Sequence, residues 1–241
     1  MATIGFHASH EQISPRRLLQ DVQLAEQAGF DAAMCSDHIE PWSARQGHSG
    51  FAWSWLGAAL ATTGLRFGVV TAPGQRYHPA IIAHASATLA DMFPGRFWMA
   101  PGSGEYMNEH ITGQAWPPKE TRQRRLEECV DIIRRLHAGD VVTHHGLVTV
   151  EQARIWDVPE TKPPLIAPAR PQATGAAPPA SWRQEERVGP PPPYARRANP
   201  RSRGRRSGCV GGWQAGCVFT GADDRPSRSW TGRRGTGPSV C

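Results

Sequence analysis

Apolar and polar residues follow two different periods along the first two-thirds of the chain. Short apolar runs between polar residues predict buried strands at residues 3–8, 30–35, 66–71, 96–100 and 164–167. Apolar positions repeated every three or four residues predict helices at residues 15–28, 53–63, 79–92 and 119–138. Residues 141–150 read as a β-hairpin centred on His145 and Gly146.

Strand and helix alternate four times, and this order predicts a parallel sheet with crossover helices. Both an open doubly wound sheet and a (β/α)₈ TIM barrel have this order. Polar clusters just beyond the strand ends favour the barrel, and no G-x-G-x-x-G follows the first strand. A whole barrel needs about 250 residues. We therefore predict an α/β barrel truncated to about its first five strands, in residues 1–168.

The composition of residues 169–241 does not predict a folded domain. From Arg170 onward there are 13 Arg, no Lys and 4 acids, with 10 Pro and 11 Gly. Leu, Ile and Met are absent there, so this segment cannot bury enough apolar area to offset its chain entropy. We predict a disordered, low-complexity tail.

Two origins of the tail remain open. A GC-rich gene that is read in the wrong frame gives this arginine-rich, lysine-free composition, which favours a frameshift near residue 168. The alternative is a genuine basic arm, whose arginines between Arg196 and Arg206 would attract nucleic-acid phosphate. Because we favour the frameshift, nucleic acid is not expected as a partner.

The start of the chain has no basic-then-apolar leader, and no apolar run approaches about 18 residues. A cytoplasmic location with no membrane segment is the expectation. The end of the first predicted strand and the loop after it hold His7, His10 and Glu11, but no third ligand at fixed spacing, so no metal site is expected.

Two polar clusters carry candidate chemistry. Asp37 and His38 follow the second strand, where a histidine can exchange protons near neutral pH and the aspartate can orient it. The plain alternative is a loop cap beside a surface histidine. Ser103, Gly104 and Glu105, with Asn108, form a glycine-rich turn whose backbone can approach a phosphate or extended cofactor. The alternative is an ordinary turn with Glu105 in water.

Taken together, residues from Ile4 to about Ile166 resemble the luciferase-like family of flavin- and deazaflavin-dependent oxidoreductases. The likeness rests on DH after the second strand, R-Y-x-P after the third and G-[ST]-G-E after the fourth. It points to the branch that holds the deazaflavin-dependent glucose-6-phosphate dehydrogenases and their FMN-using relatives. The resemblance implies a luciferase-like barrel with FMN or coenzyme F420 at its carboxyl mouth.

The resemblance also implies roles for individual residues. His38 and Glu105 would exchange protons with the substrate. The cofactor would contact Asp37, Val69, Val70, Ala72, Ser103, Gly104 and Asn108, and the substrate pocket would include Glu11 and Trp42. Val69 and Val70 fall where many members have a cis peptide bulge, and Ala72 replaces a threonine of the dehydrogenases.

The implied reaction is hydride transfer between the cofactor and a small hydroxyl or carbonyl substrate, or monooxygenation. Basic residues for a sugar phosphate cannot be assigned, so glucose 6-phosphate is not expected as the substrate. A truncated barrel leaves its edge strands unpaired, which predicts an unstable, inactive or oligomeric chain, with a homodimer as the expected folded form. The alternative function is a non-catalytic fragment whose basic tail binds nucleic acid.

Overall fold

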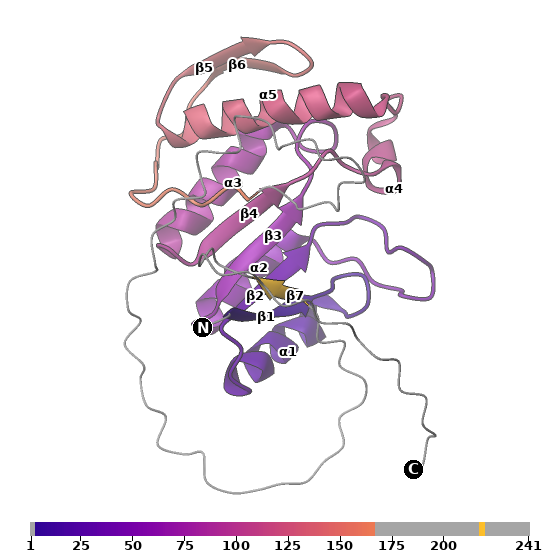
Figure 1. The fold of residues 1–241 in the computed structure, drawn as a ribbon, viewed down its shortest axis with the longest axis vertical. Helices are drawn as coiled ribbons and strands as arrows, with labels where there is room; N and C mark the ends of the chain where they lie inside the picture. Colours follow the sequence, from indigo (N-terminus) through magenta and orange to yellow (C-terminus); the bar gives the residue numbers. More distant parts are fainter. Residues whose placement is uncertain (1–2, 167–216, 220–241) are drawn as a thin grey trace, which may run out of the picture.

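The computed structural model describes residues 3–166 and 217–219 (Figure 1). Its main strands are β1 (Thr3–Ala8), β2 (Ala32–Ser36), β3 (Arg66–Thr71) and β4 (Phe97–Pro101). The long helices are α1 (Pro15–Gln27), α2 (Ala52–Thr62), α3 (Pro79–Met92) and α5 (Lys119–His137). Each of these elements agrees with its predicted range to within two residues. The short helix α4 (Tyr106–Glu109) and the 3-10 turn η1 (His110–Thr112) were not predicted.

The four main strands form a parallel sheet in the order β4-β3-β2-β1. At the outer edge of β4, Leu165 forms a parallel bridge with Met99. The amide of Met99 donates to the Pro164 carbonyl at 3.0 Å, and the amide of Ile166 donates to the Met99 carbonyl at 2.8 Å. The predicted fifth strand therefore begins beside β4 and parallel to it.

The outer edge of β1 is paired as well. The strand β7 (Cys217–Phe219) runs antiparallel to it, with Thr3 opposite Phe219 and Gly5 opposite Cys217. Part of each outer edge is therefore paired, where the sequence led us to expect unpaired edge strands. The instability expected of a truncated barrel stays a prediction. Apart from β7, which was not predicted, the expected disordered tail lies outside the described residues. The frameshift and the homodimer stay predictions.

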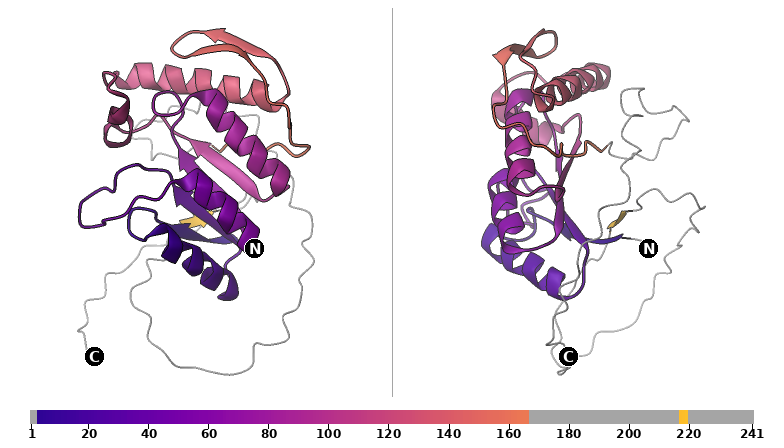
Figure 2. Two further views of the ribbon diagram at one scale, coloured as in Figure 1. Left: turned by 180° about the vertical axis from the view of Figure 1, so that it is seen from behind. Right: turned by 90° about the vertical axis from the view of Figure 1, so that its left-hand side faces the viewer.

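One face of the sheet carries the core. Helices α1, α2 and α3 all lie against that face (Figure 2). Two rows of buried side chains cross the strands there, Phe6, Ala33, Phe67 and Phe97 in one row and Ala8, Cys35, Val69 and Met99 in the next. This alternation follows from the two-residue period of a strand.

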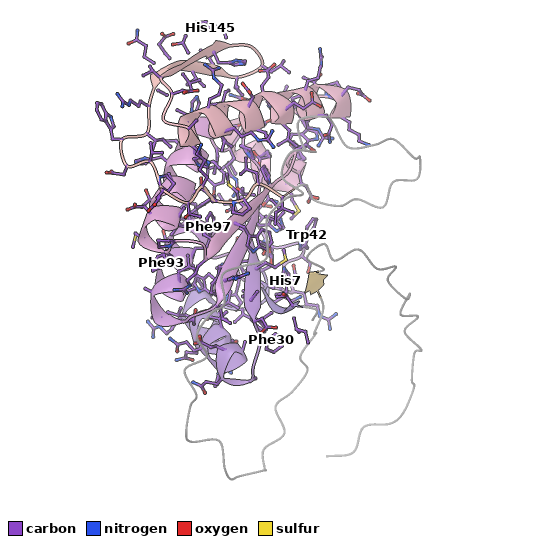
Figure 3. The ribbon with its side chains drawn as sticks, turned by 60° about the vertical axis from the view of Figure 1, so that its left-hand side comes forward. His7, Phe30, Trp42, Phe93, Phe97 and His145 are labelled. Carbon is purple, nitrogen blue, oxygen red and sulfur yellow. The ribbon has the colours of Figure 1, made fainter. Side chains whose placement is uncertain are left out.

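The opposite face is less covered. His7 is exposed and Met34 and Trp98 are half-buried, and Figure 3 shows His7 on the other side of the sheet from Phe97. In a barrel of this type the corresponding face lines the interior. Gly68 leaves space for the Trp98 indole beside β3, since a Cβ atom at Gly68 would be 2.0 Å from that ring.

The side chain of Arg96 holds the carboxyl end of α2 in place. The guanidinium of Arg96 donates to the carbonyls of Leu60, Thr63 and Leu65 at 2.6–3.1 Å, which satisfies the carboxyl end of α2.

The predicted hairpin is confirmed as β5 (Val142–His145) and β6 (Thr149–Ala153). In the described part of the chain no helix is long and apolar enough to cross a membrane.

Candidate active site

The loops that follow the four parallel strands meet at the carboxyl edge of the sheet, as they do in a barrel. Polar side chains from all four loops are buried there. They are His10 and Glu11 after β1, Asp37 after β2, Arg76 after β3, and Asn108 and Glu109 after β4. Burial of so many polar groups costs free energy unless they are paired, so their partners define the site.

His38 and Glu11 form the most direct pair. The Nδ1 atom of His38 lies 2.6 Å from Oε1 of Glu11, and the Ser9 hydroxyl donates to Oε2 at 2.7 Å. Burial opposes ionisation of Glu11, but its interactions with His38, Ser36 and Ser9 outweigh this effect and lower the pKa of Glu11 to about 2. A permanent carboxylate thus faces a histidine that water can still reach. Trp42, itself 55% exposed, stands edge-on to His38 at 5.1 Å between ring centroids.

Asp37 joins three neighbouring elements. Its carboxylate accepts hydrogen bonds from the Thr71 hydroxyl at 2.7 Å, the Tyr77 hydroxyl at 3.0 Å and the Trp53 indole at 3.3 Å. Burial, together with the charge of Asp37, raises the pKa of Tyr77 above its usual range. The structure therefore shows Asp37 as a link between β2, β3 and α2, and its contact with a cofactor stays a prediction.

Arg76 and Glu109 complete this network, and neither was singled out from the sequence. The Arg76 guanidinium donates to the Asp37 carbonyl at 2.7 Å, and the Arg76 amide donates to Oε2 of Glu109 at 2.6 Å. Burial raises the pKa of Glu109, even though the contacts with Arg76 act in the other direction. Arg76 lies in the R-Y-x-P motif, so this motif is the sequence feature from which Arg76 could have been identified.

Asn108 is brought into the site as expected, but it contacts the backbone. Its Oδ1 atom accepts from the amides of Ile39 at 2.9 Å and Glu40 at 3.4 Å. Asn108 therefore holds the loop that directly follows His38. Its predicted cofactor contact is not tested by this arrangement.

The glycine-rich turn is built around Gly104. This residue has φ +78, and a Cβ atom there would lie 3.1 Å from Cγ of Glu109. Ser103 is half-buried and accepts from the Gln123 amide at 3.3 Å. Glu105 is exposed at the start of α4, with no side-chain cap hydrogen bond. The structure thus buries Glu109 in the polar cluster, and leaves Glu105 at the surface.

The carboxyl half of β3 shows one difference from the implied geometry. Val69 and Val70 pair regularly with Met99 and Ala100 in the parallel ladder, and no cis peptide occurs within residues 3–166. The cis bulge implied at Val69–Val70 is therefore wrong for this structure, since an unbroken ladder occupies that position.

Val70, Ala72, Ser103 and Gly104 are all half-buried near the carboxyl ends of β3 and β4. Small and apolar groups of this kind can accept the ring of a flavin or deazaflavin, and the contact of these residues with FMN or F420 stays a prediction.

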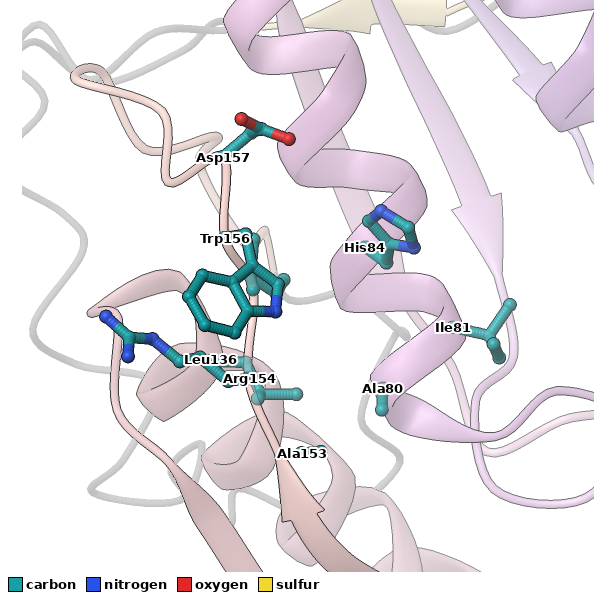
Figure 4. Close-up of a pocket in the computed structure, with 9 residues that line it drawn as sticks. Ala80, Ile81, His84, Leu136, Ala153, Arg154, Trp156 and Asp157 are labelled. Carbon is teal, nitrogen blue, oxygen red and sulfur yellow. The ribbon is translucent and has the colours of Figure 1, made fainter.

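His10 lies in this cluster, but neither of its ring nitrogens has a hydrogen-bond partner among the described residues. His10 is fully buried, edge-on to Trp55 at 4.8 Å, and burial lowers its pKa to about 4. No group of three His, Cys, Asp or Glu within this part of the chain is placed to hold a metal ion. A cavity of about 290 Å³ lies between α3, α5 and residues 153–157 (Figure 4), among Ile81, His84 and Trp156, away from the polar cluster.

A family model described as luciferase-like monooxygenase matches residues 1–181. The chain belongs to this family. It is 44% identical over 182 residues to the F420-dependent glucose-6-phosphate dehydrogenase of Beutenbergia cavernae, which covers 73% of this chain and 54% of that protein. The corresponding enzyme of Microbacterium testaceum is 43% identical over 178 residues, covering 72% and 53%.

Solved structures agree with the family. An F420-dependent secondary alcohol dehydrogenase in complex with an F420-acetone adduct is 39% identical, with a TM-score of 0.66 over 69% of this chain and 52% of that one. The FMN-bound oxygenating constituent of 3,6-diketocamphane monooxygenase from Pseudomonas putida is 18% identical with a TM-score of 0.53, covering 69% and 51%, and supports the fold alone. The chain spans about half the length of these relatives.

These comparisons confirm the resemblance and the prediction of a luciferase-like barrel fold. The described residues form four parallel strands of it, with a bridge to Leu165 at the edge of β4. The two cofactors expected from the sequence, F420 and FMN, both occur among the matched proteins.

Proposed function

We propose that this protein is a flavin- or deazaflavin-dependent oxidoreductase that exchanges a hydride with a small hydroxyl or carbonyl substrate. The contact of 2.6 Å between His38 and Glu11 at the carboxyl edge is the observation that carries the proposal. Relatives that are 39–44% identical and named for F420 favour that cofactor. FMN remains the second choice, because the FMN-bound neighbour is only 18% identical.

In this mechanism His38 is the base for alcohol oxidation. Its Nδ1 atom faces Glu11, so Nε2 is the ring nitrogen that serves the substrate hydroxyl. His38 takes the hydroxyl proton while the neighbouring carbon loses its hydrogen with both bonding electrons, and the C–O bond becomes a carbonyl. A bound flavin or deazaflavin supplies the acceptor for that hydride. Carbonyl reduction is the reverse, with His38 returning the proton.

Glu11 supports this exchange without taking the proton itself. Because its pKa is lowered to about 2, Glu11 stays negative near neutral pH and stabilises the imidazolium that His38 becomes. Trp42 forms an apolar wall beside the His38 ring. Glu105 is exposed just before α4. It would act as a second proton-exchanging group for a substrate that extends over this turn.

Of the possible substrates we propose a small secondary alcohol and its ketone. The dehydrogenase that is 39% identical carries an adduct of F420 with acetone, a molecule with no phosphate to bind. This choice is consistent with the lack of an assignable sugar-phosphate site.

The experiment is a fluorescence titration of the purified full chain with F420 and, separately, FMN, followed by incubation with 2-propanol. Quenching that saturates with one cofactor, and loss of the oxidised-cofactor absorbance when 2-propanol is added, are expected. A folded protein that binds neither cofactor contradicts the proposal. Binding without turnover removes 2-propanol as substrate and keeps the cofactor assignment.

A further inference from the structure

Helix α4 ends in two adjacent polar residues that are almost fully buried, Asn108 at 3% exposed and Glu109 at 1%. A four-residue helix has too few internal hydrogen bonds to be stable by itself. Its position depends on contacts that Asn108 and Glu109 make with loops 33 to 69 residues away. Both sets of contacts lead to the backbone around His38.

The first contact lies on the carboxyl side of His38. Asn108 accepts hydrogen bonds from the amides of Ile39 and Glu40. The Ser49 hydroxyl donates to the carbonyl of His38 itself at 2.7 Å. These bonds orient the chain as it leaves the histidine.

The second contact lies on the amino side and passes through Arg76. The Arg76 guanidinium donates to the Asp37 carbonyl, which belongs to the peptide bond that joins Asp37 to His38. Glu109 accepts from the Arg76 amide at 2.6 Å, and its Oε1 atom lies 3.6 Å from Nε of the same arginine. Arg76 also stacks on the Tyr77 ring at 4.4 Å. Glu109 thereby fixes both the backbone and the side chain of the residue that holds this peptide.

Charge explains why a carboxylate occupies this position. The Arg76 side chain is 6% exposed and lies 3.6 Å from Oδ2 of Asp37 as well as from Glu109. If Glu109 were neutral, the buried guanidinium of Arg76 would be attracted to the Asp37 carboxylate alone. That carboxylate would then compete with the Asp37 carbonyl for the N–H groups of the guanidinium. Gly104 allows Cγ of Glu109 to come this close, since a Cβ there would lie 3.1 Å away.

We propose that Glu109 is a positioning residue that acts through Arg76 to hold the Asp37–His38 peptide, and with it the His38 ring against Glu11. The contribution of Glu109 to catalysis rests on the proposed function. The placement of the His38 ring does not, because it can be observed without cofactor or substrate.

The test uses the full chain labelled with ¹³C and ¹⁵N in histidine, in the wild type and in Glu109→Gln. The His38 ring signals are assigned by their loss in His38→Gln. Glu109→Gln keeps the size of the side chain and removes its charge, so the His38 ring signals are expected to shift. Glu127→Gln, at an exposed position of α5, is the matched control and is expected to leave them in place.

A folded Glu109→Gln protein with wild-type His38 signals overturns the proposal. If Glu109→Gln does not fold, Glu109→Asp and Arg76→Lys test the same chain of contacts. The first keeps the charge and is expected to shift the signals by less, and the second keeps the charge but loses the bond to the Asp37 carbonyl. Unchanged His38 signals in both would equally overturn it.

A kinetic split distinguishes positioning from support of the fold. In Glu109→Gln, kcat is expected to fall about tenfold or more, since small misplacements of a reacting group cost this much. KM and the Kd for F420 should stay within about twofold, because neither ligand is expected to contact Glu109. Equal losses in kcat and cofactor affinity contradict the proposal. A wild type without turnover counts against the proposed function, and the NMR result still decides this inference.

Discussion

The layer between the sheet and its helices differs in kind from the carboxyl edge of the same sheet. The layer is filled by apolar side chains such as Leu56, Phe67 and Met99, all fully buried. The edge buries Asp37 and Glu109 to nearly the same degree, yet each of these carboxylates has partners from other loops. The layer stabilises the fold by removing apolar surface from water. The edge contains paired polar groups, whose hydrogen bonds favour a single arrangement of the side chains.

This difference predicts opposite outcomes for substitutions in the two regions. Truncation in the layer should reduce stability strongly, and any effect on chemistry should follow from unfolding. Substitution at the edge should cost less stability and more activity, since the side chains there are placed by hydrogen bonds that can be removed singly.

The largest stability effect is expected at the centre of the layer. Phe67→Ala removes a fully buried ring that contacts Trp55 edge-on, with 5.8 Å between centroids. The free energy of unfolding should fall by about 3–5 kcal/mol, as for other buried aromatic truncations. Urea denaturation measures it, with Phe51→Ala as the control, because Phe51 is 55% exposed. Equal losses in the two variants would contradict this account of the layer.

The next effect is a loss of stability in acid that comes from His10. Burial lowers the pKa of His10 from 6.5 to about 4. Between these pH values the unfolded chain binds a proton that the folded state excludes, so stability is full above pH 6.5 and falls as the pH drops toward 4. The loss from His10 is roughly 3 kcal/mol, at 1.36 kcal/mol per pKa unit.

His137 acts with the same sign, because burial lowers its pKa to about 4 as well. The contribution of His10 is therefore measured as a difference, by chemical denaturation of the wild type and His10→Phe from pH 7 to 4. The variant should lose less stability across this range. Parallel pH curves would show that His10 is not held neutral.

A smaller effect is expected at Gly68, beside Trp98 on the less covered face of the sheet. Gly68→Ala places a methyl group where the Trp98 ring lies, at 2.0 Å, so the indole must move. Overpacking of this kind costs about 1–3 kcal/mol. Gly57→Ala in α2 is the control, because a Cβ there meets nothing within 4 Å and should stabilise the helix by up to about 1 kcal/mol. Thermal unfolding that lowers Tm equally in both variants would contradict the contact.

The smallest effect on stability is expected at the edge. Thr71→Val removes the hydroxyl that donates to Asp37 at 2.7 Å and keeps the shape of the side chain. The loss should be about 1–2 kcal/mol, as for one hydrogen bond to a charged group. Thr62→Val is the control at an exposed position of α2, where the hydroxyl only bonds Ala58 within its own helix. Greater instability in the Thr62 variant would reverse the comparison.

The layer was the more predictable region from sequence. The apolar period of residues 15–28 and 79–92 predicted α1 and α3 closely, because a buried stripe repeats along the chain. The ends of strands likewise located His38 and Asp37 at the carboxyl edge. Helical periods and strand ends both depend on short stretches of neighbouring residues, which the sequence shows directly.

The contacts of the edge could not be derived in this way. The pairing of Glu11 with His38 joins residues from two loops, so it cannot be predicted from hydrophobic periodicity or from the spacing of residues along the chain. Helix α4 has only four residues, too few to show a helical period, so the burial of Glu109 could not be predicted. The strand β7 was missed because three residues in an arginine-rich segment give no strand pattern.

The most direct test of the central claim compares His38→Ala with the wild type in the rate of cofactor reduction by a secondary alcohol. The account predicts a loss of about 10²–10⁴-fold, the usual contribution of a general base, with the Kd for F420 unchanged. A variant that binds F420 and reduces it at the wild-type rate would show that the His38–Glu11 pair does not carry the proton, and would contradict the assignment of this edge as the active site.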